Sequence, residues 1–398
     1  MDRRTEIPGR RRVAPHVAEL PKSGIRRFFD IVAQAKDVVS LGVGEPDFDT
    51  PWHISRAAVT CLEDGGTHYT SNLGTPALRR AIAGYMERRF GARFDPQGEI
   101  LATVGVSEAI DLAIRAICSP GDEVLYHEPC FVSYAPTIRL AHAVPVCVET
   151  RVEDEFRLTV AALERRATPR TRAILLNFPC NPTGATLSAD DMRGILEFAA
   201  RRDLLVLADE VYSELNYADE EPFPSFSSFP EFRDRVVLLN GFSKSWAMTG
   251  YRLGYACGPS DVIDAMMKIH QYGIMSAPTL SQAAGVEAMD HGDKDVARMR
   301  REYRRRRDYL VPALNAMGLG TLMPKGAFYV FSDVSAFGLP DGDFALRLLN
   351  EHRVACVPGA AFGRSGAGFV RMSYATSMEK LRVAVERIGE FVASLRRS

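Results

Sequence analysis

The chain of 398 residues is 46% hydrophobic and 25% charged, which is an ordinary globular composition and leaves room for two domains. Its formal net charge is −1 at pH 7, so the chain has no net field that would attract nucleic acid or an anionic membrane surface. No apolar run in the sequence approaches the length of a membrane span. These properties favour chemistry on small molecules.

The N-terminal segment and the cysteines indicate a cytoplasmic protein. Residues 1–17 are basic but lack the apolar core of a secretory signal, and we expect a flexible arm there. The seven cysteines are scattered and form no CxxC pair, which is the spacing typical of zinc sites and redox dithiols. We therefore expect reduced thiols and no metal site.

Short apolar runs alternate with amphipathic stretches through the middle of the chain. The runs ILATV, EVLYH, VPVCV, AILLN, LVLAD, VVLLN and LGYAC begin at residues 100, 123, 144, 173, 205, 236 and 253. This alternation predicts strands that helices bury on both faces, in a mostly parallel seven-stranded sheet. We expect this large α/β domain to span residues 56–289.

The pattern of apolar and polar residues changes after residue 290. The stretch RMRREYRRRRDYL carries seven arginines, but the helical spacing of Tyr303, Leu310 and Leu314 predicts a helix with a solvated arginine face rather than a nucleic-acid patch. Strand-like and helical segments alternate from there to the end of the chain. We expect a smaller α+β domain at 290–398, with residues 1–55 supplying an N-terminal arm and part of that domain.

Polar side chains follow several of the expected strands. In open α/β sheets, ligands bind beyond the carboxyl ends of the strands. Ser107 lies in a glycine turn at an expected helix start, where it is either part of a phosphate site or merely an N-cap. Asn181 lies in an Asn-Pro turn, and Asp209 ends a strand so apolar that its carboxylate needs a cationic or donor partner. Lys244 follows the next strand, where desolvation and neighbouring cations would lower its pKa and make it nucleophilic toward aldehydes.

Together these groups match the requirements of pyridoxal phosphate. Lys244 would form the Schiff base, Asp209 would face the pyridinium nitrogen, and Asn181 and Tyr212 would donate to the phenolate oxygen. The catalytic candidates are thus Lys244, Asp209 and Tyr212. The other cofactor-binding candidates surround the ring and the phosphate: Val106, Ser107, Glu108, Phe131, Ser243 and Arg252.

Several blocks, in this order, resemble the class I/II (fold-type I) pyridoxal-phosphate-dependent aminotransferases, in the subgroup of prokaryotic aspartate and aromatic amino-acid aminotransferases. The blocks are SLGVGEPDFDTP, HYTSNLGTPALR, VGVSEAIDLA, NFPCNPTG, LADEVYSEL, NGFSKSWAMTGYRLGY, GAFYVF and VRMSYATS, and the likeness extends from Ser23 over nearly all of the remaining chain. The resemblance implies ping-pong transfer of the amino group of an L-amino acid to a 2-oxo acid such as 2-oxoglutarate.

The resemblance also implies roles that spacing alone does not give. Arg371 matches the arginine that binds the substrate α-carboxylate, together with Asn181, and Gly44 matches a backbone position that lines the substrate pocket. Tyr69 matches a tyrosine that reaches the phosphate bound in the other subunit. We therefore expect a homodimer with shared active sites.

The chain departs from its relatives around the substrate side chain. Residues 271–278 contain no arginine or lysine, although one branch of aspartate aminotransferases supplies an arginine from this region. Ser107 and Ile25 stand where some prokaryotic aspartate enzymes use a lysine and a threonine, and burial against Ile25 favours apolar groups by about 1.5–3 kcal/mol. We expect a broad specificity for aspartate, aromatic and aliphatic amino acids, with Arg26 or Arg27 responsible for any acidic preference.

The sequence is compatible with three alternative functions to different degrees. A C-S lyase or an aminocyclopropane carboxylate synthase on the same fold would share every cofactor residue. An effector domain of a transcription regulator would bind the cofactor without turnover, but no winged-helix segment precedes residue 20. A dinucleotide-dependent dehydrogenase would need a GxGxxG after its first strand and would leave Lys244 unexplained.

Overall fold

The computed structural model of the chain describes residues 12–21, 37–217 and 224–397, and its centre is a seven-stranded sheet. The strands are β2 (Ile100–Thr103), β3 (Glu123–Glu128), β4 (Val144–Glu149), β5 (Thr171–Asn177), β6 (Leu205–Asp209), β7 (Val236–Gly241) and β8 (Gly254–Cys257). They lie in the order β2-β8-β7-β6-β5-β3-β4, and within this sheet β8 alone runs antiparallel to its neighbours. The seven expected strands and the mostly parallel sheet are confirmed.

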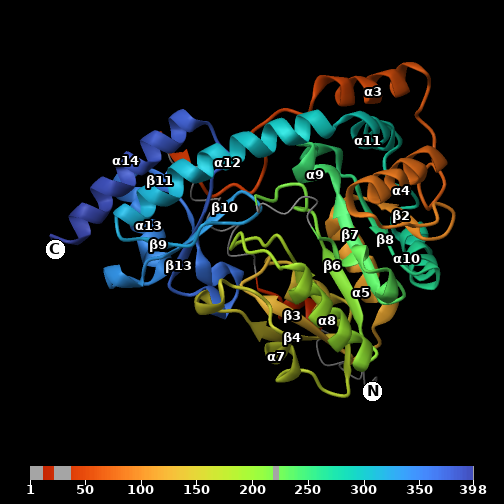
Figure 1. The fold of residues 1–398 in the computed structure, drawn as a ribbon, viewed down its shortest axis with the longest axis horizontal. Helices are drawn as coiled ribbons and strands as arrows, with labels where there is room; N and C mark the ends of the chain where they lie inside the picture. Colours follow the sequence, from red (N-terminus) through yellow and green to blue (C-terminus); the bar gives the residue numbers. More distant parts are fainter. Residues whose placement is uncertain (1–11, 22–36, 218–223, 398) are drawn as a thin grey trace, which may run out of the picture.

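Helices cover both faces of this sheet (Figure 1). In β6, Val206 and Ala208 belong to one hydrophobic core and Leu207 to the other, because successive side chains of a strand point to opposite faces. The Leu207 core includes α5 (Gly105–Ile117), α6 (Tyr134–Leu140) and α10 (Ser260–Gly273). The other core includes α3 (Trp52–Glu63), α4 (Pro76–Phe90), α7 (Val160–Glu164), α8 (Ala189–Arg201), α9 (Phe242–Ser245) and α11 (Thr279–His291). The apolar strands are thus buried from both sides.

The smaller domain has its own core and an antiparallel sheet in the order β12-β13-β10-β9. Its elements are α12 (Asp293–Ala316), β9 (Gly320–Thr321), β10 (Tyr329–Asp333), α13 (Asp341–His352), β11 (Val354–Ala355), β12 (Val357–Pro358), β13 (Phe369–Ser373) and α14 (Met378–Leu395). Near the N-terminus, α1 (Pro15–Ala18) packs on α6, and β1 (Val39–Ser40) pairs in parallel with β11. The chain just before the large domain therefore joins the C-terminal domain.

Short 3-10 turns connect these elements. They are η1 (Val152–Asp154), η2 (Phe226–Ser228), η3 (Pro230–Phe232), η4 (Thr249–Tyr251), η5 (Ser335–Phe337), η6 (Gly359–Phe362) and η7 (Arg364–Gly366). All seven cysteines are free thiols. Along the described ranges, no helix is long and apolar enough to cross a membrane.

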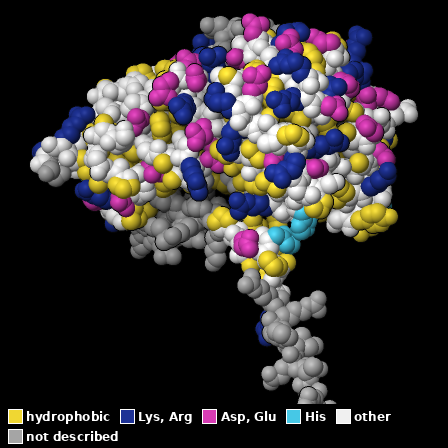
Figure 2. Space-filling view, turned by 90° about the horizontal axis from the view of Figure 1, so that it is seen from below, with side chains coloured by type: hydrophobic (Ala, Val, Ile, Leu, Met, Phe, Trp, Pro, Cys, Tyr) yellow, Lys and Arg dark blue, Asp and Glu magenta, His cyan; other side chains and the backbone are white. Residues whose placement is uncertain are grey.

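The arginine-rich stretch forms part of α12, with Tyr303, Leu310 and Leu314 buried as expected. The expectation of a solvated arginine face is wrong at two positions, because Arg306 and Arg307 are only 5% and 7% exposed. Both guanidinium groups lie near aromatic rings and pair with carboxylates, which compensates for their removal from water. Elsewhere, Figure 2 shows basic and acidic side chains interspersed over one face of the molecule.

An ion pair between the partly exposed Arg89 and the buried Glu214 connects α4 to the chain after β6. Glu214 is 4% exposed, and its two carboxylate oxygens accept hydrogen bonds from Arg89 Nε at 2.9 Å and Arg89 Nη2 at 2.8 Å. The hydroxyl of Tyr85 donates to the same carboxylate. Removal of Arg89 would leave a buried anion with a single neutral donor.

We therefore expect Arg89→Met to lower the free energy of unfolding by about 3 kcal/mol, because breaking a buried pair strands the remaining charge. The matched control is Arg93→Met, whose pair with Glu87 joins side chains that are 82% and 54% exposed. Its loss should cost about 0.5 kcal/mol or less. Urea unfolding of both variants measures the difference in unfolding free energy. Equal losses in the two variants would contradict a stabilising role of the Arg89–Glu214 pair.

Candidate active site

The expected site residues meet in a cavity of about 340 Å³ at the carboxyl ends of β5, β6 and β7. Asn177 and Asp209 end two of these strands, and β7 leads directly into α9, which carries Lys244. Parallel neighbours end at the same edge of a sheet, so their terminal side chains are brought together. The predicted residues that line the cavity are Gly44, Val106, Ser107, Phe131, Asn181, Asp209, Tyr212, Ser243, Lys244, Arg252 and Arg371.

Lys244 is held inside this cavity as a weakened base. Its Nζ donates a hydrogen bond to the carbonyl oxygen of Gly44 at 2.7 Å. Burial lowers the pKa of Lys244 to about 8, with Arg371 and Arg252 adding to the decrease and Glu45 opposing it. A larger fraction of the amine is therefore neutral, and able to attack a carbonyl, at neutral pH than for an ordinary lysine.

Asp209 is a buried carboxylate with two donors. The hydroxyl of Tyr134 donates to its Oδ2 at 2.6 Å, and the backbone N–H of Val211 donates to its Oδ1 at 3.2 Å. Burial raises the pKa of Asp209 to about 6, while these hydrogen bonds and Lys244 limit the increase. Near pH 7 the group is mainly ionised and suited to pair with a ring cation.

Arg371 is a buried guanidinium at 2% exposure. Its Nη1 donates to Asn181 Oδ1 at 3.0 Å and its Nη2 to the carbonyl oxygen of Gly42 at 2.5 Å, while its Cζ lies 4.5 Å from the ring centroid of Tyr329. Burial lowers the pKa of Arg371, its Nε has no hydrogen-bond partner, and among the described residues no carboxylate pairs with it. A buried cation in this state is suited to a carboxylate brought by a ligand.

The start of α5 forms an anion cradle. The helix begins at Gly105 with Val104 as its N-cap, so the alternative role of Ser107 as N-cap is wrong; Ser107 lies in the first turn and is exposed to the cavity. Gly105 has φ +75°, and a Cβ there would lie 2.7 Å from Arg252 Nη2. Only glycine lets that guanidinium lie against the helix start. Together with Ser243, these groups fit a phosphate dianion.

Two of the predicted residues that the structure describes do not line the cavity. Glu108 accepts from the backbone N–H of Val104 and bonds His270 Nδ1 at 2.8 Å, so its carboxylate is engaged away from the site. Tyr69 is 82% exposed and lies outside the cavity of its own chain. Ile25 lies outside the described residues, as do Arg26 and Arg27.

Sequence reasoning missed several lining residues: Glu45, Ile110, Asn177, Val211, Thr249 and Tyr329. The hydroxyls of Tyr329 and Tyr212 are 2.8 Å apart, and a Cβ on Gly44 would lie 2.6 Å from the Tyr329 hydroxyl. Tyr329 lies inside GAFYVF, one of the blocks on which the family resemblance rests, but the sequence assigned no role to it. Tyr134, the donor to Asp209, gave no sequence signal because it lies within an ordinary core helix.

The family profile described as Aminotransferase class I and II matches residues 36–388. The chain is 45% identical to the aspartate aminotransferase of Pyrococcus abyssi, over 92% of this chain and 94% of the relative. It is 42% identical to aromatic-amino-acid aminotransferase 2 of Thermococcus litoralis, with the same coverage of both chains. A single mutant of the Thermus thermophilus aspartate aminotransferase superposes with a TM-score of 0.91 at 39% identity, covering 96% of this chain and 100% of that one.

The chain belongs to the class I and II aminotransferases. It is an enzyme of amino-group transfer on the fold-type I architecture, as the sequence predicts, and the lyase alternative is not favoured. Members of this family generally depend on pyridoxal phosphate.

The lowered pKa of Lys244 gives a test on the cofactor-free enzyme. Below pH 8 its amine is mostly ammonium and does not attack aldehydes, so reductive methylation by formaldehyde at Lys244 should rise about tenfold per pH unit and level off near pH 8. An ordinary lysine would keep gaining reactivity to about pH 10. Peptide mass spectrometry reads each lysine separately, with Lys244→Arg as the blank. A Lys244 profile that still climbs about tenfold per pH unit between pH 8 and pH 10 would disprove the lowered pKa.

Proposed function

We propose that this aminotransferase binds pyridoxal phosphate at Lys244 and moves the amino group of an L-amino acid to a 2-oxo acid such as 2-oxoglutarate in ping-pong order. The observation that supports this most is the meeting of three groups in one cavity. Lys244 has a pKa of about 8, Asp209 is a buried carboxylate, and Arg371 is a buried cation without a carboxylate partner among the described residues.

The residues present fit the cofactor. What bound pyridoxal phosphate supplies is an aldehyde carbon that condenses with amines and a ring that withdraws electrons from the α-carbon. Asp209 would pair with the ring nitrogen and keep it protonated, and Phe131 would stack on the ring face. Tyr212 and the amide of Asn181 would donate to the phenolate oxygen. The start of α5, Ser243 and Arg252 would hold the phosphate.

Arg371, Asn181 and Lys244 would have separate roles toward the substrate. Arg371 would bind the α-carboxylate through its guanidinium fork, and Asn181, whose Oδ1 already accepts from Arg371, would leave its amide N–H groups for the ligand. Lys244 would take the proton from the substrate α-carbon and return it as general base and acid. Its pKa of about 8 suits both roles near neutral pH.

The described residues that line the cavity suit a broad set of substrate side chains. Val106, Ile110, Phe131 and Tyr329 contribute apolar or aromatic surface. Within the described part of the chain, the cations that line the cavity are those already proposed for the cofactor and the α-carboxylate. Relatives are named for aspartate and for aromatic amino acids, and we propose that this enzyme accepts both, with aliphatic amino acids.

The decisive experiment measures kcat/KM for aspartate, phenylalanine, tyrosine, leucine and methionine with 2-oxoglutarate as acceptor. Several substrates should react within a hundredfold of one another, because among the described residues the cavity is lined by no further cation that could select an acidic side chain; a hundredfold corresponds to about 2.7 kcal/mol. Lys244→Ala should lose turnover and the borohydride-sensitive visible absorbance of the wild type. If Lys244→Ala transaminates at the wild-type rate, the role assigned to Lys244 is wrong.

The same panel on Arg26→Ala and Arg27→Ala tests the source of any acidic preference. If either arginine supports aspartate, its removal should lower kcat/KM for aspartate and leave leucine unchanged. A wild type that favours aspartate by more than a hundredfold, and keeps this preference in both variants, would overturn the proposed breadth.

We further propose that the enzyme is a homodimer whose subunits share active sites. Large aromatic side chains are exposed on α3, between α3 and α4, and near the end of α10: Trp52 (71%), Tyr69 (82%) and Tyr272 (88%). The loops near them are joined, since Asn72 Nδ2 donates to the carbonyl oxygen of Met275 at 2.7 Å. Solvent-exposed aromatic side chains of this size are typical of subunit interfaces.

Subunit mixing tests this arrangement. Chains with Tyr69→Ala and chains with Lys244→Ala should each be impaired alone, but in a mixed dimer one site would combine an intact Lys244 with a Tyr69 from the partner. We expect such dimers, isolated by two affinity tags, to recover up to half of the wild-type rate, since one of two sites is complete. Wild-type dimers carrying the same tags serve as the control. No recovery in a verified mixed dimer would contradict shared sites.

A further inference from the structure

Residues 41–50 run from the small domain across the cavity to the large domain. β1, just before this segment, pairs with β11, and at the far end Thr50 Oγ1 donates to the carbonyl oxygen of Ala247 at 2.7 Å. Between these anchors, the carbonyl oxygen of Gly42 accepts from Arg371 and that of Gly44 from Lys244. One short stretch of backbone thus touches both cations of the site.

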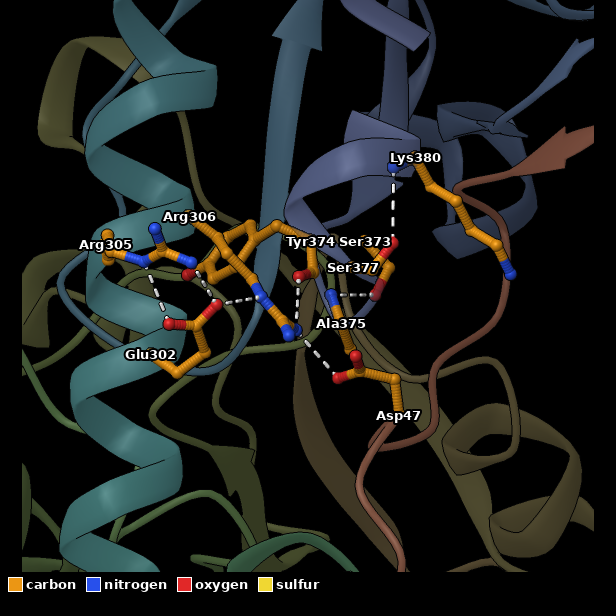
Figure 3. A network of polar contacts seen from close by, with 9 residues as sticks. All are labelled: Asp47, Glu302, Arg305, Arg306, Ser373, Tyr374, Ala375, Ser377 and Lys380. Atoms are coloured by element: carbon orange, nitrogen blue, oxygen red, sulfur yellow. Dashed lines mark hydrogen bonds and ion pairs between the residues drawn. The ribbon is translucent and has the colours of Figure 1, made fainter. Parts of the chain in front are cut away.

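The middle of this segment is fixed by Arg306 of α12, as Figure 3 shows. Asp47 Oδ1 lies 2.7 Å from Arg306 Nη1, and Glu302 Oε1 lies 3.0 Å from Arg306 Nε. The aromatic ring of Phe48 adds a second contact, with its centroid 5.3 Å from the Arg306 Cζ. Arg306 is only 5% exposed, so these contacts operate with little competition from water.

Arg306 also reaches the strand that carries Arg371. Its Nη1 donates to the carbonyl oxygen of Tyr374 at 3.5 Å, just past the end of β13. Beside this point, the backbone N–H of Ser373 donates to the carbonyl oxygen of Leu41 at 2.6 Å. The two pieces of backbone that set Arg371 against Gly42 are therefore both attached to one guanidinium group.

We propose that Arg306 is a positioning residue for substrate binding. It acts through Asp47 and the carbonyl oxygen of Tyr374 to keep Gly42 and Arg371 in register, so that the guanidinium fork meets the carboxylate common to amino-acid and 2-oxo-acid substrates. A small displacement of a binding group removes much of its contribution to substrate binding. The Arg306–Asp47 pair can therefore affect substrate binding without touching the substrate. The inference rests on the proposed role of Arg371.

Asp47 and Glu302 provide a matched pair of variants. Each contributes one carboxylate to Arg306, with side chains 25% and 26% exposed, but only Asp47 belongs to the segment that contacts the site. Asp47→Asn should raise KM for both the amino acid and the 2-oxo acid about fivefold, with a smaller change in kcat. Glu302→Gln should leave KM within about twofold. Arg305→Gln, which removes another partner of Glu302 on the exposed side, is the second control.

Binding without turnover separates positioning from stability. The probe is 3-phenylpropionate, which has a carboxylate and an apolar side chain but no amine to react. By calorimetry, Asp47→Asn should weaken its binding about fivefold, as in the KM, while pyridoxal phosphate affinity stays unchanged. Thermal midpoints measured alongside show whether each variant is folded. Arg306→Lys, which keeps the charge but not the fork, should resemble Asp47→Asn.

Two outcomes would overturn the proposal: unchanged probe affinity in Asp47→Asn, or equal losses in Asp47→Asn and Glu302→Gln, which indicate that the cluster merely stabilises the fold. The proposed function is tested separately by Arg371→Lys. If that variant binds the probe as tightly as the wild type, the carboxylate site itself is misassigned and the role of Arg306 falls with it.

Discussion

The site depends on keeping two cations, Lys244 and Arg371, out of water in the same cavity. Neither has a carboxylate hydrogen-bonded to it within the described structure; both instead donate to backbone carbonyls of the segment at 42–44. Burial lowers the pKa of both groups, and the nearby charge of Arg371 lowers that of Lys244 further. In the proposed function, the amine of Lys244 is thereby available for covalent chemistry and the guanidinium of Arg371 for an anion, and we propose that α12 helps to maintain that arrangement.

The sequence alone predicted the parts of the site that depend on strand ends. Asp209 and Lys244 each follow an apolar run whose burial on both faces is evident from its composition, and a parallel sheet necessarily gathers such positions at one edge. The same reasoning predicted all seven strands of the large sheet. Arg371 and Gly44 required the family resemblance, because they come from the two ends of the chain and no local pattern connects them.

The rest could not be predicted because it depends on contacts distant in sequence. Tyr134 meets Asp209 only after α6 has packed on the sheet, and Tyr329 meets Tyr212 across 117 positions of the sequence. The surface role expected for the arginine-rich helix failed at Arg306 for the same reason. Helical spacing identifies which residues face a core, but it does not reveal that a loop more than 200 residues earlier will supply Asp47 as a partner.

The pairing of β1 with β11 has a consequence for how the enzyme is made. The seven strands of the large sheet are contiguous in the chain and can assemble as soon as they leave the ribosome. The stretch containing Gly42 is synthesised before all of them, yet its partner Arg371 follows 329 residues later. The nascent chain therefore carries the Gly42 part of the proposed carboxylate site without its partner until β13 is synthesised. If Arg371 binds the substrate carboxylate as proposed, a chain interrupted late in translation would contain the complete large sheet and Lys244 but would lack the group that binds the substrate.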